Sequence, residues 1–193
     1  MNYMPEELSS LRAYECTIEY RNNGEEYFFK TESGAYYSCY FANASGYFEE
    51  YPLIKDDIVT FGFGLLSPSK GFFVEKHDPR IKETIFYILI QAAETYPERS
   101  FFVMYSTDEG RQRNRKVTFD RWYNDYCKLV GGAVTKISIS APTIDGSFIF
   151  NMMMLVPNTC SKLELIKSTC IEIKDEFISK GYPPSLECRI ECK

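Results

Sequence analysis

The chain has 193 residues, of which 45% are hydrophobic, 16% aromatic and 25% charged. This length allows one well-buried domain, and the composition excludes the disordered and collagen-like classes. The net charge is −5, but residues 1–60 carry eleven acidic and four basic side chains, a local charge of −7 that leaves +2 for the remainder. The acidic N-terminal part argues against binding of nucleic-acid phosphates there, whereas a basic partner could meet it.

The seven cysteines form an odd set without a Cys-x-x-Cys pair. Five of them lie in apolar segments, which is typical of buried thiols in a reducing compartment; they are Cys16, Cys39, Cys127, Cys160 and Cys170. The first twelve residues have neither signal-peptide nor anchor features. No stretch approaches the roughly 20 apolar residues of a membrane-spanning helix. We therefore expect a cytoplasmic protein without membrane contact.

The N-terminal third predicts an antiparallel β-meander. Apolar and polar residues alternate over 14–20, as in a half-buried strand. Asn23-Gly24 predicts a hairpin turn, since both residues tolerate positive φ. Further strands are expected over residues 27–31, 35–41 and 57–65. Gly62 and Gly64 share one face of the last strand, which indicates a bulge or the close approach of a backbone or a ligand.

Helices and strands alternate in the rest of the chain. Asp78-Pro79 predicts a helix start, with Asp78 as N-cap and Pro79 at the first helical position, and the helix runs to about Thr95. Ser161 and Glu164 fit a capping box at the start of the last helix. The other expected elements are a strand over 101–105, a basic helix after Gly110, strands over 134–141 and 148–156, the last helix over 163–180, and a tail over 186–192 that forms either an edge strand or a loose end.

These elements predict an α+β fold, in which the meander is followed by α-β-α-β-β-α and the helices pack on one mixed or antiparallel sheet. No repeat or linker divides the chain, so we expect a single domain over 1–193 with an N-terminal arm (1–12) and a C-terminal tail (185–193). The order of elements resembles the acetyltransferase-type topology. In that family a glycine-rich loop before the central helix holds the cofactor pyrophosphate, whereas residues 75–79 here supply acids and a proline, which oppose phosphate binding.

The sequence contains no motif for most classes of catalytic chemistry. His77 is the single histidine, and the cysteines lack the spacing of metal ligands. The chain has no Walker loop, no dinucleotide-binding fingerprint and no nucleophile elbow. We therefore expect no catalytic residue, no metal and no cofactor.

The stretch over 101–126 joins an apolar strand, a polar turn and a basic helix that carries the single tryptophan. Positive charges gather in the first turns of this helix, where the dipole is already positive, at Arg111, Arg113, Arg115 and Lys116. Each such charge costs about 0.3–1 kcal/mol at an exposed site, so a nearby acid or an anionic partner must offset it. Asp120, four residues after Lys116, is one such acid.

Helical spacing separates these basic residues into two sets. Arg111 and Arg115 continue the apolar stripe of the helix, and with Asp108 and Glu109 they form a candidate structural network. The candidate binding residues are Arg113, Lys116, Arg121 and Trp122, a mixture typical of interface hot spots. Three interpretations stay open: an internal arginine network, a surface for a protein partner, and a phosphate or nucleic-acid contact.

At these residues the chain resembles a family of uncharacterised bacterial proteins, a domain of unknown function. The family pattern is a strand, then Ser-Ser/Thr-Asp-Gly-Arg-Gln, and a helix with Phe-x-Arg-Trp-Phe/Tyr-Asn. The matching residues are Ser106, Thr107, Asp108, Gly110, Arg111 and Gln112, then Phe119, Arg121, Trp122, Tyr123 and Asn124. Glu109 departs from the pattern as an insertion in the turn. The resemblance implies a bacterial source and no established activity.

The leading hypothesis is a non-catalytic protein-interaction module, with a protein partner or self-association and no nucleic acid. One alternative is an acyltransferase-like small-molecule enzyme with an atypical cofactor site. The other is weak binding of nucleic acid or another anion through the basic helix after Gly110.

Overall fold

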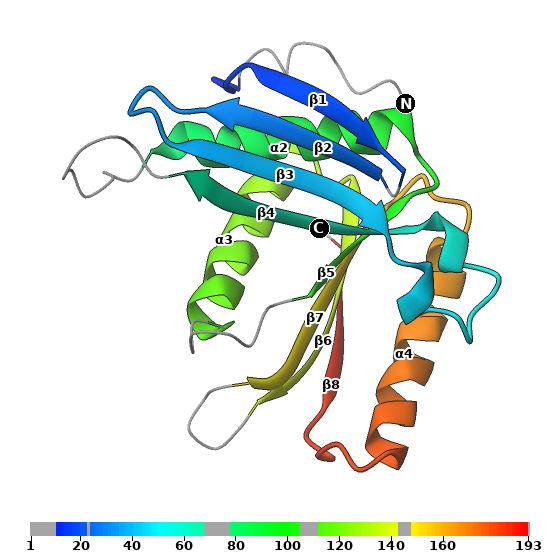
Figure 1. Ribbon diagram of the computed structural model, residues 1–193. Coiled ribbons are helices and arrows are strands. Elements are labelled where there is room, and N and C mark those ends of the chain that lie inside the picture. The colour runs from blue at the N-terminus through cyan, green and yellow to red at the C-terminus, as the bar shows by residue number, and fades with distance from the viewer. Residues whose placement is uncertain (1–10, 23, 68–77, 105–111, 143–147, 193) are drawn as a thin grey trace. The chain divides into compact units, whose positions relative to one another are not determined.

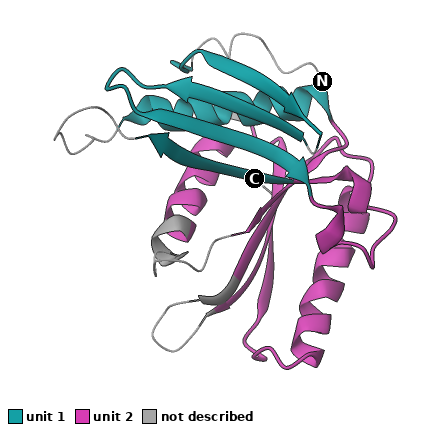
Figure 2. Ribbon diagram, in the orientation of Figure 1, with its two compact units in different colours: residues 1–43, 60–96 teal, residues 44–59, 97–193 magenta. Residues whose placement is uncertain are grey.

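A computed structural model describes residues 11–22, 24–67, 78–104, 112–142 and 148–192. The chain divides into two compact units, and neither is continuous in sequence (Figure 2). Unit 1 comprises residues 1–43 and 60–96, and unit 2 comprises residues 44–59 and 97–193. The expected arm over 1–12 lies almost entirely outside the described residues, and the single domain remains a prediction.

The α+β prediction is confirmed. In the described part of the chain, eight strands follow the order β1-β2-β3-β4-β5-β7-β6-β8 in one sheet, and three α-helices accompany them (Figure 1). The strands are β1 (Cys16–Arg21), β2 (Gly24–Lys30), β3 (Tyr36–Asn43), β4 (Ile58–Ser67), β5 (Ser100–Met104), β6 (Val134–Pro142), β7 (Phe148–Pro157) and β8 (Glu187–Cys192). The helices are α2 (Pro79–Thr95), α3 (Gln112–Val130) and α4 (Leu163–Ser179). Of the two alternatives for the tail, the edge strand is the one that forms.

Unit 1 contains the predicted meander and helix. β1, β2 and β3 pair in antiparallel succession, and α2 lies along one face of their sheet (Figure 1). The start of α2 has the predicted cap, because Asp78 accepts a hydrogen bond of 2.9 Å from the Arg80 backbone N–H and Pro79 follows at the first helical position. Aromatic rings cross the sheet in a stack in which Phe29 lies between Tyr14 and Tyr37, with centroid distances of 6.1 and 5.3 Å.

The two glycines of β4 have different surroundings. A Cβ atom added to Gly62 would lie 2.3 Å from the ring of Tyr40 on β3, whereas nothing lies within 4 Å of one added to Gly64. An aromatic side chain of the same unit, rather than a backbone or a ligand, therefore makes the close approach at Gly62.

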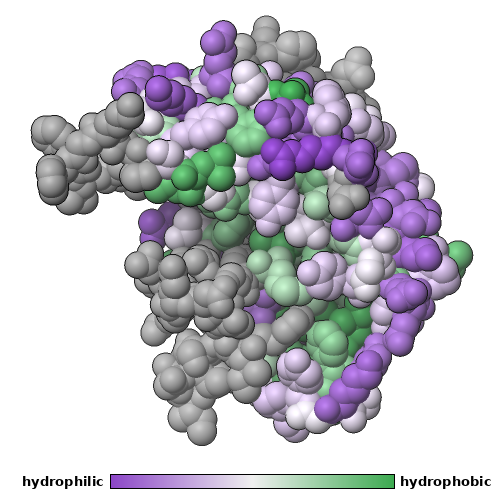
Figure 3. All heavy atoms as spheres, in the orientation of Figure 1, coloured by the Kyte–Doolittle hydropathy of each residue, from purple (hydrophilic) through white to green (hydrophobic). Residues whose placement is uncertain are grey.

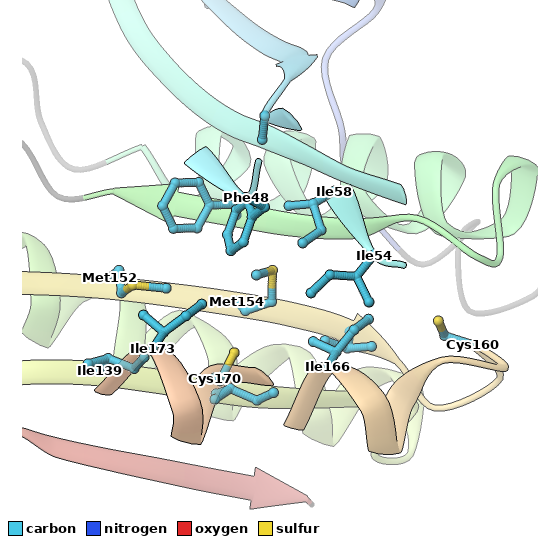
Figure 4. Close-up of a cluster of buried hydrophobic side chains, with 14 of the residues drawn as sticks. Phe48, Ile54, Ile58, Ile139, Met152, Met154, Cys160, Ile166, Cys170 and Ile173 are labelled. Atoms are coloured by element: carbon cyan, nitrogen blue, oxygen red, sulfur yellow. The ribbon is translucent and has the colours of Figure 1, made fainter. Parts of the chain in front are cut away.

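In unit 2, α3 and α4 pack on opposite faces of the antiparallel strands β5-β7-β6-β8. Successive side chains of a strand point to opposite faces. Lys136 on β6 points to α3, where its ammonium lies 4.8 Å from the Tyr123 ring centroid. Its neighbour Ile137 belongs to the hydrophobic cluster that includes Ile166 of α4. Figure 4 shows this cluster, with the side chains of β7 facing those of α4 and of the segment 44–59.

The capping box predicted for α4 is wrong. The N-cap of α4 is Lys162, without a side-chain cap hydrogen bond. Ser161 instead turns to Glu98, whose carboxylate accepts hydrogen bonds from the Ser161 hydroxyl at 2.6 Å and from its backbone N–H at 3.0 Å. A carboxylate that is distant in the sequence thus binds the serine hydroxyl that the local pattern assigned to the cap of the helix.

Candidate functional site: a tyrosine groove on unit 1

A groove of about 550 Å³ opens on unit 1 between α2 and the strands β1 and β2. Such a volume is typical of sites that bind small molecules or side chains. We call it the tyrosine groove because five tyrosines line it: Tyr14, Tyr20, Tyr27, Tyr87 and Tyr96. The other lining residues are Leu11, Ala13, Glu15, Cys16, Ile18, Glu25, Gln91 and Thr95.

Strand pairing brings the central residues of the groove together. Ile18 lies directly opposite Tyr27, and Tyr20 lies directly opposite Glu25. These four side chains share the face of the sheet that lines the groove, since residues two apart on a strand point the same way. Ile18 and Tyr20 are nevertheless 44% and 76% exposed. The groove therefore exposes apolar and aromatic surface at the β1 side and buries polar groups at the β2 side.

The buried polar group is Glu25, which is 8% exposed. The Tyr27 hydroxyl donates a hydrogen bond of 3.3 Å to its carboxylate. Burial, together with the neighbouring Glu25 carboxylate, raises the pKa of Tyr27 to about 12. Tyr27 therefore stays a neutral donor at physiological pH, and the carboxylates of the groove are Glu25 and the exposed Glu15. None of the described residues that line the groove is basic.

Tyr14 ties the groove to the start of α2. Its hydroxyl donates to Asp78 Oδ2 at 2.7 Å and accepts from the Glu32 backbone N–H at 3.3 Å. The Arg80 guanidinium lies 3.9 Å from the centroid of the Tyr14 ring, in a cation–π contact. The Tyr14 backbone N–H donates to Thr84 Oγ1 at 2.9 Å. One tyrosine thus connects the chain before β1, the turn before β3 and the first turns of α2.

Replacing Tyr14 with phenylalanine should lower the free energy of unfolding by about 1–2 kcal/mol. The ring and its stacking would remain, but Asp78 and the Glu32 amide would lose their part-buried hydrogen bonds to the hydroxyl, and each hydrogen bond contributes about 0.5–1.5 kcal/mol net. Urea unfolding followed by circular dichroism measures the change.

The matched control is Tyr20→Phe, at a side chain that is 76% exposed. Its effect should stay within about 0.5 kcal/mol, as for ordinary surface substitutions. Equal effects of the two substitutions would contradict the role assigned to the Tyr14 hydroxyl.

The residues predicted on the basic helix are only partly described. Asp108, Glu109 and Arg111 lie outside the described residues, as do the side chains of Arg113 and Arg115. The candidate structural network therefore remains a prediction. Lys116, Arg121 and Trp122 lie on α3 in unit 2, and the Trp122 ring packs 5.9 Å from that of Phe119. Lys116 pairs with Asp120 at 2.6 Å, so the acid four residues along the helix does engage it.

Lys116 is part of a network of ion pairs that the sequence did not predict. Lys136 is 2% exposed, and its ammonium lies 2.8 Å from Asp120 Oδ1 and 2.9 Å from Glu191 Oε1. Burial raises the pKa of Asp120, but the hydrogen bonds from Lys116 and Lys136 outweigh burial, and the net effect lowers that pKa. The Tyr123 hydroxyl lies 3.0 Å from the Val134 carbonyl oxygen and donates to it. With every charge paired, this network braces α3 on the sheet of unit 2.

Unit 2 has a smaller groove of about 310 Å³ beside α4. Its lining is mostly apolar and includes Tyr47, Phe102, Met104 and Phe177. Figure 3 shows hydrophobic residues gathered beside α4, with hydrophilic ones along the outer side of the helix. Three glutamates line it, Glu49, Glu50 and Glu176, and Glu176 accepts a hydrogen bond of 3.0 Å from the Tyr51 hydroxyl and pairs with Lys180. Lys180 thus gives the smaller groove a basic lining residue, whereas none of the described residues that line the tyrosine groove is basic.

In the part of the chain that the structure describes, no three His, Cys, Asp or Glu side chains are placed to hold a metal ion. Nor does any described helix have the length and apolar character needed to cross a membrane. In comparisons with known proteins, the chain matches no family model, no curated protein and no solved structure. The resemblance to uncharacterised bacterial proteins accordingly remains a prediction.

Proposed function

We propose that this protein is a non-catalytic protein-interaction module and that the tyrosine groove of unit 1 receives a cationic group of its partner. One observation carries the proposal: five tyrosines and two carboxylates line the groove, and no basic side chain is among its described lining residues. The proposal gives the acidic N-terminal part of the chain a function, since Glu15 and Glu25 both belong to it.

A cation suits this lining for two physical reasons. Aromatic faces attract cations, by about 0.5–1 kcal/mol at exposed sites and about 2 kcal/mol when the groups are desolvated. A carboxylate that is largely buried, as Glu25 is, gains more from a positive charge than an exposed one, because the surrounding dielectric constant is lower. An anionic group would meet the same two carboxylates with the opposite sign. The groove therefore selects for positive charge.

The chemistry around the groove favours binding over catalysis. Cys16, the only cysteine among its described lining residues, has its pKa raised to about 11 by burial, so the reactive thiolate is scarce at neutral pH. The acyltransferase-like alternative needs a helix start that accepts pyrophosphate. At the start of α2, the Asp78 carboxylate already accepts the Arg80 N–H, and Pro79 supplies no N–H. This negative charge opposes a phosphate at that position.

N-acetyl-arginine methylamide and its neutral isostere, N-acetyl-citrulline methylamide, test the proposal. In an NMR titration of the full chain, the arginine compound should shift the amide signals of Glu25 and Tyr27, and the citrulline compound should not. Glu25→Gln should weaken arginine binding at least tenfold, which corresponds to about 1.4 kcal/mol. The two ligands differ in charge but hardly in shape, so their comparison isolates the electrostatic part of the binding.

Glu26→Gln is the matched control, because Glu26 neighbours Glu25 on β2 and its side chain points to the opposite face, where it pairs with Arg21 at 2.9 Å. This variant should bind the arginine compound within twofold of the parent. Equal binding of arginine and citrulline compounds, or equal affinity of Glu25→Gln and the parent, would refute the proposed function.

A further inference from the structure

We propose that the cationic group arrives on an extended, basic segment of another protein, which adds to the outer edge of β1 as a further strand. This inference rests on the proposed function of the tyrosine groove and specifies how the partner enters it. Two features of unit 1 support it: an edge strand beside the groove, and exposed groove-facing side chains on that strand.

β1 stands at the end of the strand order, and among the described strands it pairs only with β2. In an antiparallel pair, every second residue directs its backbone N–H and C=O away from its neighbour. The outer side of β1 therefore presents a row of donors and acceptors that an extended peptide can satisfy. Peptide segments commonly bind sheet edges in this manner, with main-chain hydrogen bonds for affinity and alternate side chains for specificity.

The groove lies where those alternate side chains would fall. An added strand would place every second side chain on the face that carries Ile18 and Tyr20, both substantially exposed. Tyr20 is directly opposite Glu25 across β1 and β2. Two strand spacings, roughly 10 Å, would separate the new strand from β2. A long arginine or lysine side chain can extend across Tyr20 and bring its charge towards Glu25 while its methylene groups cover the ring.

Charge decides between a foreign segment and a second copy of this chain. Glu15 lines the groove, and Glu19 lies on β1 itself. Glu19 pairs with Arg21 of the same strand, so the charges of β1 itself balance. A second copy that paired edge to edge would direct its Cys16, Ile18 and Tyr20 to the groove face, and none of these supplies a positive charge. A basic segment would instead bring its cations to Glu15 and Glu25 of the groove. The partner is therefore a basic strand of a different protein.

The test uses the peptide acetyl-Thr-Arg-Thr-Arg-Thr-Arg-Thr-amide and a set of variants, each N-methylated at one backbone position. If the peptide forms a strand, methyl groups on the amides that face β1 should weaken binding at least tenfold, and those on the intervening amides should change it less than twofold. Isothermal titration calorimetry with the full chain measures the affinities. Hydrogen exchange should also show added protection at every second amide of β1.

The outcomes distinguish this inference from the proposed function. If the peptide binds and N-methylation has no alternating effect, strand addition is refuted while the groove can still bind cations. Strand addition is also refuted if N-acetyl-arginine methylamide binds and the peptide binds no more tightly than this compound. If neither ligand binds, both proposals fail. Reversible dimers of the protein alone, dissociated by charge reversal at Glu19, would assign the edge to a second copy and refute the inference as well.

Discussion

Gly24→Ala is expected to destabilise unit 1 by about 3 kcal/mol, at the upper end of the cost of inserting one carbon atom into a packed site. A Cβ atom added to Gly24 would lie 1.7 Å from the carbonyl oxygen of Phe41 on β3. The backbone φ angle of +152° is also one that residues with a side chain rarely adopt. Neither the added Cβ atom nor the carbonyl oxygen can move without its own backbone. The strands β2 and β3 must therefore separate to relieve the clash. Denaturant unfolding followed by circular dichroism measures the loss.

Gly64→Ala is the matched control, because Gly64 is also a strand glycine of unit 1 and nothing lies within 4 Å of its added Cβ atom. Its effect should stay within about 0.5 kcal/mol. If Gly24→Ala unfolds at the same denaturant concentration as the parent, the register that places Gly24 opposite Ala42 is not the one that the chain adopts in solution.

The contrast between Gly24 and Tyr20 shows what local pattern can and cannot predict. Asn23-Gly24 indicated a hairpin because turn chemistry is local, and β2 does begin at Gly24. The crowding of Gly24 by β3 depends on a strand that begins twelve residues later, so no local signal predicts it. Similarly, period-two alternation placed Ile18 and Tyr20 on one face, but their exposure depends on how far α2 covers the edge of the sheet.

The residues of the candidate site were missed for a related reason. The basic helix stands out in the sequence because its charge is unusual, whereas a groove arises where two elements leave a gap. Glu25 follows the turn directly in the sequence, a position at which an acidic side chain is ordinarily expected to be solvated. It is buried because Tyr20 pairs with it and because α2 and the residue after it contribute Tyr87 and Tyr96 to the same groove. Strand register and helix placement, both tertiary properties, create the site.

The partners of Ser161 and Lys136 also come from distant parts of the chain, and local sequence pattern did not predict them. Ser161 fitted a capping box, but a carboxylate from residue 98 competes successfully for its hydroxyl. Lys136 occupied a strand position that alternation could assign to either face, and an uncompensated buried lysine is costly. Its acceptors come from Asp120, sixteen residues earlier, and from Glu191, near the end of the chain. Local periodicity does not predict ion pairs between residues that are so far apart in the sequence.

Lys136→Met should lower the free energy of unfolding of unit 2 by about 2–3 kcal/mol. Removing one member of a buried ion pair ordinarily costs about 3–5 kcal/mol. The cost here should be smaller, because Asp120 and Glu191 are each one-third exposed and water can solvate them once the ammonium is gone. Lys116→Met is the control: it removes another partner of Asp120, but one nearer to solvent, and should cost less than about 1 kcal/mol.

Acidification provides the second measurement on the same variant. The pKa of Asp120 is lowered in the folded protein from its ordinary value of 3.8, so its ion pairs stabilise the fold above that value and are lost as the pH falls through the folded pKa. In Lys136→Met, Asp120 retains Lys116 alone, and its folded pKa should rise towards the ordinary value. The parent should therefore lose more stability than the variant between about pH 5 and pH 2. Parallel pH profiles for the two proteins would show that Lys136 does not hold Asp120 in its charged form, and the network would then contribute packing rather than electrostatic stabilisation.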